Sequence, residues 1–408
     1  MEIALQKGRI LLPRKDIPME TWAVVECDQF TAQPEYWNAA EALVGDRPST
    51  LRLTLPEIYL GESETRVPAI QNAMKAALEG GVLEAAVEAG FVLVRRETTT
   101  GVRPGLVVCL DLEQYDFSRD SASLIRPTEG TIASRVPPRA KIRAGARMEL
   151  PHVMMLIDDP QCTVIEPLLA RSASLRKLYD FDLMLGGGHL TGWAVEDANA
   201  QGVFQALEAL CAASDGLLYA VGDGNHSLAA AKQCWMDMRD ALDETQRKNH
   251  PARYAMVELV NLNCPALVFE PIHRVLMHVD APALLDEYET YLEGHGACVR
   301  HGGSDLQAVW AGGTRSYASV EHPLRLLQAF LDEYLTRHPE AEIDYIHGDA
   351  ALRKLAGRPD TLGLMPRAFD KGELFPFIRK WGPLPRKTFS MGEATDKRYY
   401  VEARQIVR

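Results

Sequence analysis

The residue types best suited to chemistry lie together in residues 221–232, which read VGDGNHSLAAAK. An apolar run ends there, glycines flank an acid, and a helical pattern follows, so the segment predicts a strand, a tight turn and a helix start. A helix N-terminus offers free N–H groups to a phosphate. Asp223 could orient a cation, and His226 could exchange a proton with a phosphoryl oxygen. The alternative is a turn without a ligand, in which Asn225 caps the helix and His226 is simply exposed.

A second candidate segment combines an acid with a run of cations. Residues 126–131 read RPTEGT, and Glu129 could act as a general base toward a hydroxyl. Five basic residues follow in an otherwise acidic chain: Arg135, Arg139, Lys141, Arg143 and Arg147. Guanidinium and ammonium groups bind phosphates, so this run predicts a local anion site. A solvated basic loop is the alternative for each of these residues.

The segment Pro271-Ile272-His273-Arg274 follows an apolar run and could add a second histidine and a cation. A histidine with a purely structural role fits it equally well. Several known frameworks are missing from the sequence: it contains no P-loop motif, no G-x-G-x-x-G, no G-x-S-x-G and no H-E-x-x-H. Nucleotide binding through a P-loop or a Rossmann fingerprint is therefore not expected.

The elements that must position these residues follow from hydrophobic periodicity. Strands are predicted at 153–157 and 217–221, a helix at 225–238, and a hairpin from 91 to 112 around Thr100-Gly101. Further helices are predicted at 68–89 with a break at Gly80-Gly81, and at 164–179, 199–213, 281–293 and 323–337. Helices and strands intermix without a regular βαβ rhythm, so the fold class is α+β, with mixed sheets and flanking helices. We expect three lobes: 1–115, 116–280 and 281–408.

Composition excludes several classes of function. The chain has 408 residues with 44 basic and 56 acidic side chains, a net charge of −12, which argues against coating a nucleic acid. No stretch approaches the roughly 20 apolar residues of a membrane helix, and the N-terminus has no apolar signal core. Seven cysteines without a C-x-x-C pair predict neither a zinc knuckle nor a disulfide framework. Reduced thiols in a cytoplasmic protein are the expectation.

The order of the motifs carries a resemblance to a known family. R-P-x-E-x-T at 126–131, D-G-x-H at 223–226 and P-x-H-R at 271–274 resemble a bacterial and archaeal domain-of-unknown-function family, over nearly the whole chain. The central part is also similar to the ParB/sulfiredoxin-like fold, and in particular to the free-serine kinases built on it. These enzymes phosphorylate the hydroxyl of free L-serine with a glutamate as general base.

The resemblance implies roles for individual residues. Glu129 would be the base, and Asp223 and His226 would act with it in catalysis, with Asp223 also available to a Mg²⁺ ion that accompanies the donor. Thr128 replaces a histidine of the family pattern, and Asn225 and Ser227 replace a histidine and an arginine. Loss of that arginine favours a compact donor, so pyrophosphate is expected first and ADP or ATP second. The implied donor contacts are Gly224, Asn225, Ser227, Arg126, Thr131, Arg135, Arg139, Lys141, Arg143, His273 and Arg274.

Two alternative functions stay open at this point. A phosphatase or pyrophosphatase would use the same site with water in place of serine. A nucleotide-binding, ParB-like regulatory module would bind without turnover. Small molecules are the expected partners, with neither nucleic acid nor membrane among them, and the sequence does not reveal the oligomeric state.

Overall fold

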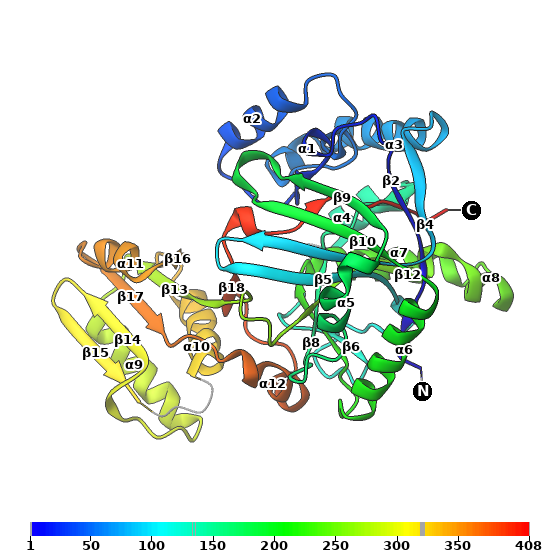
Figure 1. The fold of residues 1–408 in the computed structure, drawn as a ribbon. Coiled ribbons are helices and arrows are strands. Elements are labelled where there is room, and N and C mark those ends of the chain that lie inside the picture. The colour runs from blue at the N-terminus through cyan, green and yellow to red at the C-terminus, as the bar shows by residue number, and fades with distance from the viewer. Residues whose placement is uncertain (1, 133, 135, 319–322, 408) are drawn as a thin grey trace. The chain divides into compact units, whose positions relative to one another are not determined.

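The computed structural model describes residues 2–132, 134, 136–318 and 323–407, which form two compact units (Figure 1). The first comprises Met1–Leu267, Ile378–Gly382 and Gly392–Arg408, and the second comprises Val268–Phe377 and Pro383–Met391. The sequence suggested three lobes with a boundary near residue 115. Strands on both sides of residue 115 pair in one sheet, so these residues share the first unit.

The first unit contains most of the elements. Its helices are α1 (Met19–Trp22), α2 (Pro34–Val44), α3 (Ser63–Glu79), α4 (Val136–Ala144), α5 (Glu166–Ala170), α6 (Asp197–Ala212), α7 (Asn225–Arg239) and α8 (Glu244–Asn249). Its strands are β1 (Leu5–Gln6), β2 (Gly8–Pro13), β3 (Val24–Val25), β4 (Leu83–Thr98), β5 (Gly101–Asp111), β6 (Ile125–Pro127), β7 (Met148–Glu149), β8 (Met154–Ile157), β9 (Lys177–Asp182), β10 (His189–Val195), β11 (Tyr219–Asp223), β12 (Tyr254–Asn261), β19 (Tyr399–Tyr400) and β20 (Arg404–Gln405).

A ten-stranded sheet organises this unit within the described residues. Its order is β6-β11-β8-β12-β5-β4-β10-β9, with β1 on β5 and β2 on β4. The β6–β11 and β8–β12 pairs are parallel, whereas β11–β8 and β12–β5 are antiparallel. Two short pairs, β3–β19 and β7–β20, stand beside it. The mixed sheet with flanking helices confirms the α+β fold class.

Both faces of the large sheet are buried along runs such as Phe91–Val94 of β4 and Leu106–Leu110 of β5, where consecutive residues are apolar and buried. On β4, Val92 and Val94 join one hydrophobic cluster, whereas Phe91 and Leu93 join another. Alternate residues of a strand point to opposite faces, so each cluster covers one face. Helices α2 and α3 contribute to the first cluster, and α6 and α7 contribute to the second. Helix α7 is therefore anchored in the core by its apolar side.

Several predicted elements are confirmed and two are wrong. The hairpin is β4–β5, paired through Thr98 and Gly101, and the helices near 199–213 and 225–238 are α6 and α7. The second half of the predicted helix 68–89 is strand instead, since β4 begins at Leu83. The predicted helix 164–179 is reduced to the five residues of α5, and β9 begins at Lys177. The first error arises because pairing within the sheet overrides local preference, whereas in the second a 3-10 turn at Ser172–Ser174 follows α5 and β9 replaces the end of the predicted helix.

The second unit is a separate α+β assembly. Its strands are β13 (Phe269–Met277), β14 (His301–Trp310), β15 (Gly313–Tyr317), β16 (Glu342–His347), β17 (Thr361–Pro366) and β18 (Phe389–Met391). Its helices are α9 (Ala281–Gly294), α10 (Pro323–Arg337) and α11 (Asp349–Ala356), while α12 (Leu374–Trp381) has residues in both units. The described strands form one sheet in the order β15-β14-β17-β13-β16, with β18 on β13. Among the described residues, no helix has the length and apolar character that crossing a membrane requires.

Candidate active site

Two of the motifs meet because β6 and β11 are parallel neighbours. Arg126 and Pro127 of β6 pair with Ala220 and Val221 of β11. Thr128 continues this contact, since its backbone N–H and its Oγ1 both donate to the Val221 carbonyl, at 3.3 and 2.6 Å. Parallel strands end at the same edge of a sheet, where α/β sheets commonly bind ligands. The segment that carries Glu129 and the turn that follows β11 therefore share one edge.

The turn after β11 requires a glycine at position 224. Gly224 has φ +79° and ψ 26°, in the left-handed region, and is the N-cap residue of α7. A Cβ at this position would lie 3.0 Å from Val153 Cγ2 and 3.1 Å from Val153 Cα. The Gly224 N–H donates to Asp223 Oδ1 at 2.8 Å, which fixes the acid at the end of β11. The predicted strand, glycine turn and helix start are confirmed.

Asn225 is the first residue of α7 and does not cap it. Among the described residues, no side chain caps this helix, and Asn225 Oδ1 is buried without a hydrogen-bond partner. A buried amide oxygen of this kind is unfavourable unless a ligand or water pairs with it. The ligand-free alternative, in which Asn225 caps the helix, is therefore not what the structure adopts.

His226 holds the loop that follows Glu129. Its Nε2 accepts a hydrogen bond of 3.2 Å from the Ile132 N–H. The imidazole thus ties residues 129–132 to the first turn of α7, and Thr131 lies half-buried in the same loop. One of the two ring nitrogens of His226 has this positioning contact, and the proton exchange expected of His226 stays a prediction.

A third segment enters the site from the N-terminal end of the chain. In the β3–β19 pair, Val25 lies opposite Tyr399, and the Glu26 N–H donates to the Arg398 carbonyl at 2.9 Å. This pairing places the residues after β3 beside those before β19. Lys397, just before β19, donates from Nζ to Asp223 Oδ2 at 2.7 Å. The two-stranded pair is thereby joined to the turn after β11.

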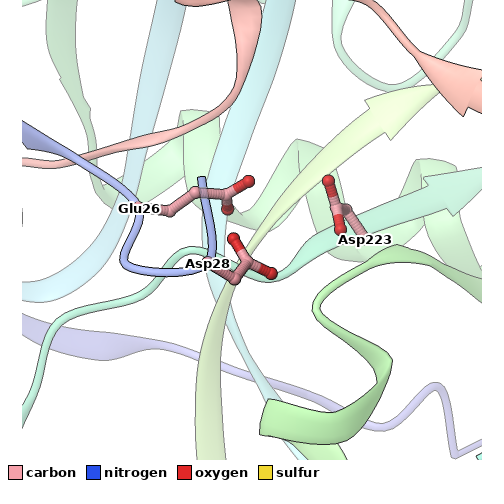
Figure 2. Close-up of side chains that lie close together, drawn as sticks. All are labelled: Glu26, Asp28 and Asp223. Carbon is pink, nitrogen blue, oxygen red and sulfur yellow. The ribbon is translucent and has the colours of Figure 1, made fainter. Parts of the chain in front are cut away.

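Three carboxylates come together at this junction. One ligand oxygen each from Glu26, Asp28 and Asp223 lies within 4.8 Å of the other two, and Figure 2 shows the three side chains facing one another. Burial, together with the charges of Asp28 and Asp223, raises the pKa of Glu26 well above its usual value. Although burial opposes it, Lys397 lowers the pKa of Asp223. Asp223 and Glu26 in turn raise the pKa of Lys397 against its own burial, so Lys397 is an ammonium that faces several acids.

A cavity of about 160 Å³ opens beside these groups. Its polar lining includes Arg139, His152, Ser227 and Tyr400, and the remainder is mainly apolar side chains between α3 and α4. His152 Nδ1 lies 3.3 Å from the Tyr400 hydroxyl, and burial lowers the pKa of His152. The cavity is large enough for a small polar molecule next to the first turn of α7.

A larger cavity, of about 720 Å³, lies between α4 and α7. Its lining is mostly apolar and includes Lys141 and Arg143, but neither Glu129 nor any residue from 223 to 227. None of the motif residues that could act as an acid, a base or a metal ligand lines this cavity. The smaller cavity also lacks Glu129, but Ser227 of the second motif lines it, so we assign the candidate site to that cavity and the carboxylate junction.

The predicted basic residues are mostly engaged elsewhere. Arg126 is buried, and its guanidinium donates to the carbonyls of Ser123 and Gly216 at 2.8 and 3.0 Å, at the start of β6 and β11 rather than at the edge with Asp223. On α4, Arg139 is paired with Glu57, and Arg143 with Glu149 at 2.6 Å. Lys141 is exposed, and Arg135 lies outside the described residues. The basic run is thus largely held in ion pairs within the protein.

His273 and Arg274 belong to the second unit, on β13. His273 is 2% exposed, and its Nε2 lies 2.8 Å from Asp349 Oδ1. Arg274 is fully buried and contacts Gln328 and the Ile272 and Arg386 carbonyls. All these partners lie in the second unit, so the structure gives both residues a role in the packing of that unit.

Sequence reasoning missed Glu26, Asp28, His152 and Lys397. Their only local signal was position, since Glu26 and Asp28 end an apolar run and Lys397 precedes the RYYV strand. The Lys397–Asp223 contact joins residues 174 positions apart. No spacing pattern in one sequence reveals a contact at such a separation.

The chain is similar to several solved structures at low sequence identity. Among solved structures, a conserved hypothetical protein from Pyrococcus furiosus is 9% identical with a TM-score of 0.38, over 74% of this chain and 95% of that chain. A free serine kinase mutant in complex with ADP is 10% identical with a TM-score of 0.41, over 75% and 94%. C-terminally truncated SbnI from Staphylococcus aureus is 7% identical with a TM-score of 0.38, over 70% and 82%.

The sequence itself matches no curated protein. It does match a family model described as a protein of unknown function, DUF1015, over residues 11–354. That range covers both candidate motifs of the first unit and most of the second unit. The chain therefore belongs to the DUF1015 family.

Proposed function

We propose that this protein is a kinase-type phosphotransferase that moves a phosphoryl group from pyrophosphate to the hydroxyl of free L-serine, with ADP or ATP as the second choice of donor. One observation carries the proposal. The parallel pairing of β6 and β11 brings the Glu129 segment to the same edge as Asp223 and the first turn of α7. A base and a phosphate cradle are the two parts that transfer to an alcohol requires.

In the proposed reaction, Glu129 accepts the proton of the serine hydroxyl as its oxygen attacks the transferred phosphorus. The new bond joins the serine oxygen to phosphorus, and the bond to the bridging oxygen of pyrophosphate breaks. Inorganic phosphate leaves with that bridging oxygen. The N–H groups at the start of α7 would hold phosphate oxygens, because their partial positive charge faces the same edge. Positioning and charge neutralisation supply most of the rate in reactions of this class.

Asp223 and Lys397 would have different electrostatic roles at this edge. Asp223 is kept ionised by Lys397, which suits it to hold a Mg²⁺ ion that accompanies the donor. A bound Mg²⁺ would offset the negative charge of the phosphates. The Lys397 ammonium lies next to the same carboxylate and could contact a phosphate oxygen when the donor is bound.

The test is direct detection of the product. The protein is incubated with L-serine and Mg²⁺, with pyrophosphate, ADP or ATP in parallel, and phosphoserine is measured by ³¹P NMR and mass spectrometry. Phosphoserine formed with pyrophosphate supports the full proposal, and phosphoserine formed only with a nucleotide keeps the kinase and replaces the donor. Phosphate release that does not depend on serine, or no turnover with any donor, overturns the proposal.

Glu129→Gln tests the base. Because the amide cannot take the hydroxyl proton, we expect turnover to fall by roughly 10²–10⁴-fold while donor affinity is retained. Glu208→Gln, on the exposed face of α6, is the matched control and should keep normal turnover. Near-normal turnover of Glu129→Gln would remove Glu129 from the mechanism.

A further inference from the structure

We propose that Glu26 and Asp28 join Asp223 as ligands of one divalent cation of the Mg²⁺ type. The sequence offered only Asp223 as a possible ligand, and the other two come from the segment after β3. Binding of the ion rests on the geometry of these three side chains. Its role with a phosphate donor rests on the proposed phosphotransferase function.

The geometry fits a single ion. The three carboxylates each offer an oxygen within 4.8 Å of the other two, and Figure 2 shows them converging from two different segments. Two oxygens that ligate one Mg²⁺ at about 2.1 Å lie no more than about 4.2 Å apart, so a small side-chain adjustment would close the site. Carboxylate oxygens are the ligands that hard cations prefer, and the group contains neither thiolate nor imidazole.

A second, independent feature points into this space. Glu26 is only 1% exposed, yet its Oε2 has no hydrogen-bond partner among the described residues. A buried carboxylate oxygen without a partner is strongly unfavourable, and a cation is the partner that would satisfy it best. The other oxygen is accounted for, because Gln29 Nε2 donates to Glu26 Oε1 at 3.1 Å.

Gln29 also orients the second carboxylate. Its Nε2 lies 3.0 Å from Asp28 Oδ1, so one amide contacts both Glu26 and Asp28. Asp223 is fixed in the same way, by the Gly224 N–H on Oδ1. Each acid therefore has one oxygen held by a neutral donor, as ligands of metal sites commonly do through outer-shell hydrogen bonds.

The negative charge of the three carboxylates also favours binding of another cation. Lys397 contacts Asp223 at 2.7 Å, and the charge of Arg103 acts on Glu26 more weakly than that of Lys397. These two cations face three carboxylates, which leaves an excess of negative charge in the group. A divalent ion among the three oxygens would offset this excess charge without displacing Lys397, because each Asp223 oxygen has a second lone pair beside the one that accepts from Lys397 or from the Gly224 N–H.

The experiment measures Mn²⁺ binding to the metal-free full chain by electron paramagnetic resonance, with Mg²⁺ as competitor. We expect one Mn²⁺ per chain, displaced by Mg²⁺, and at least 10-fold weaker binding in Glu26→Gln and in Asp28→Asn. Glu208→Gln should bind as the unmodified protein does. Thermal unfolding in EDTA shows whether each variant is folded, and Glu26→Gln should be at least as stable there because it removes like-charge repulsion.

The proposed ion site would be overturned if the unmodified protein binds no Mn²⁺. It would also be overturned if both variants bind Mn²⁺ with the same affinity as the unmodified protein. The same samples are assayed for phosphoserine, so that the two proposals can fail separately. Mn²⁺ binding that depends on Glu26 and Asp28 without any phosphoserine would keep the ion site and remove the proposed function. Phosphoserine formation at full rate in EDTA would remove the ion from the reaction.

Discussion

At the scale of single residues, the site contains buried side-chain oxygens that have no hydrogen-bond partner among the described residues. Asn225 and Glu26 each present a buried oxygen without a partner in the described part of the chain, and both lie at the edge where β11 ends or beside it. By contrast, the guanidinium of Arg126 is satisfied by backbone carbonyls. Unpaired buried groups at one edge are typical of a ligand-binding site.

Gly224→Ala should lower both the stability of the protein and the affinity of the site for Mn²⁺, although it adds only one methyl group. The added Cβ would meet the Val153 backbone and side chain, and the positive φ is unfavourable for alanine. We expect the free energy of unfolding to fall by about 1–3 kcal/mol. Mn²⁺ affinity should fall by a larger fraction of its value, because Asp223 is hydrogen-bonded to the Gly224 N–H.

Chemical denaturation and the Mn²⁺ titration measure both quantities. Gly202→Ala is the control, because a Cβ at that helical glycine would meet no atom within 4 Å. Alanine should be tolerated there or slightly stabilising. Equal effects of the two substitutions would show that the turn after β11 is not specially constrained.

The pH dependence of stability has one clear local source. His189 Nδ1 and Nε2 lie 2.7 Å from Asp182 and Asp180, and these two carboxylates raise the pKa of His189. A raised folded-state pKa adds stability below the unfolded value of about 6.5, and this is lost as pH rises through the folded value. The group is partly exposed, so the effect should be below about 1 kcal/mol.

His189→Asn should therefore destabilise the protein at pH 5.5 and have a smaller effect at pH 9. Urea denaturation at the two pH values measures the difference. The pKa of Asp180 is lowered to about 2, so this carboxylate is ionised at both values and its own titration does not interfere. An equal loss at pH 5.5 and pH 9 would contradict the assignment.

At the scale of elements, the sequence predicted best where local and tertiary preferences agree. The β11 strand, the glycine turn and α7 follow from Val221, Gly224 and the alanine-rich pattern after it, and the hairpin follows from Thr100-Gly101. Residues 83–89 read as helix because LEAAVEA is rich in helix formers. They form strand because β4 is paired on one side by β2 and continues into the hairpin.

The basic run illustrates a different limit of prediction. The sequence predicted an anion site from a run of cations, of which α4 carries Arg139 and Arg143. Their partners, Glu57 and Glu149, are acids that no local pattern connects to α4. Whether a cation is available to a ligand or is already paired depends on long-range packing. A single sequence therefore locates the candidate residues more reliably than it assigns their contacts.

At the scale of the whole chain, the C-terminal segment Gly392–Arg408 completes the first unit. Arg398 is the centre of its attachment: it is paired with Glu258 on β12, contacts Glu402 at 2.5 Å and donates to the Pro151 carbonyl at 2.9 Å. These groups are buried, and Glu402 also accepts from Tyr179. The neighbouring Lys397 reaches the site only because this segment is held in place.

Arg398→Met should therefore affect both stability and the site. It would leave Glu258 and Glu402 buried without their cation, which costs about 3–5 kcal/mol when one partner of a buried pair is removed. We expect the midpoint of urea denaturation to fall accordingly, and Mn²⁺ binding to weaken because β19 no longer holds the segment after β3. Arg398→Lys retains the charge without the planar fork and should lose less. If Arg398→Met unfolds at the same urea concentration as the unmodified protein, the C-terminal segment is not what holds the N-terminal carboxylates opposite Asp223.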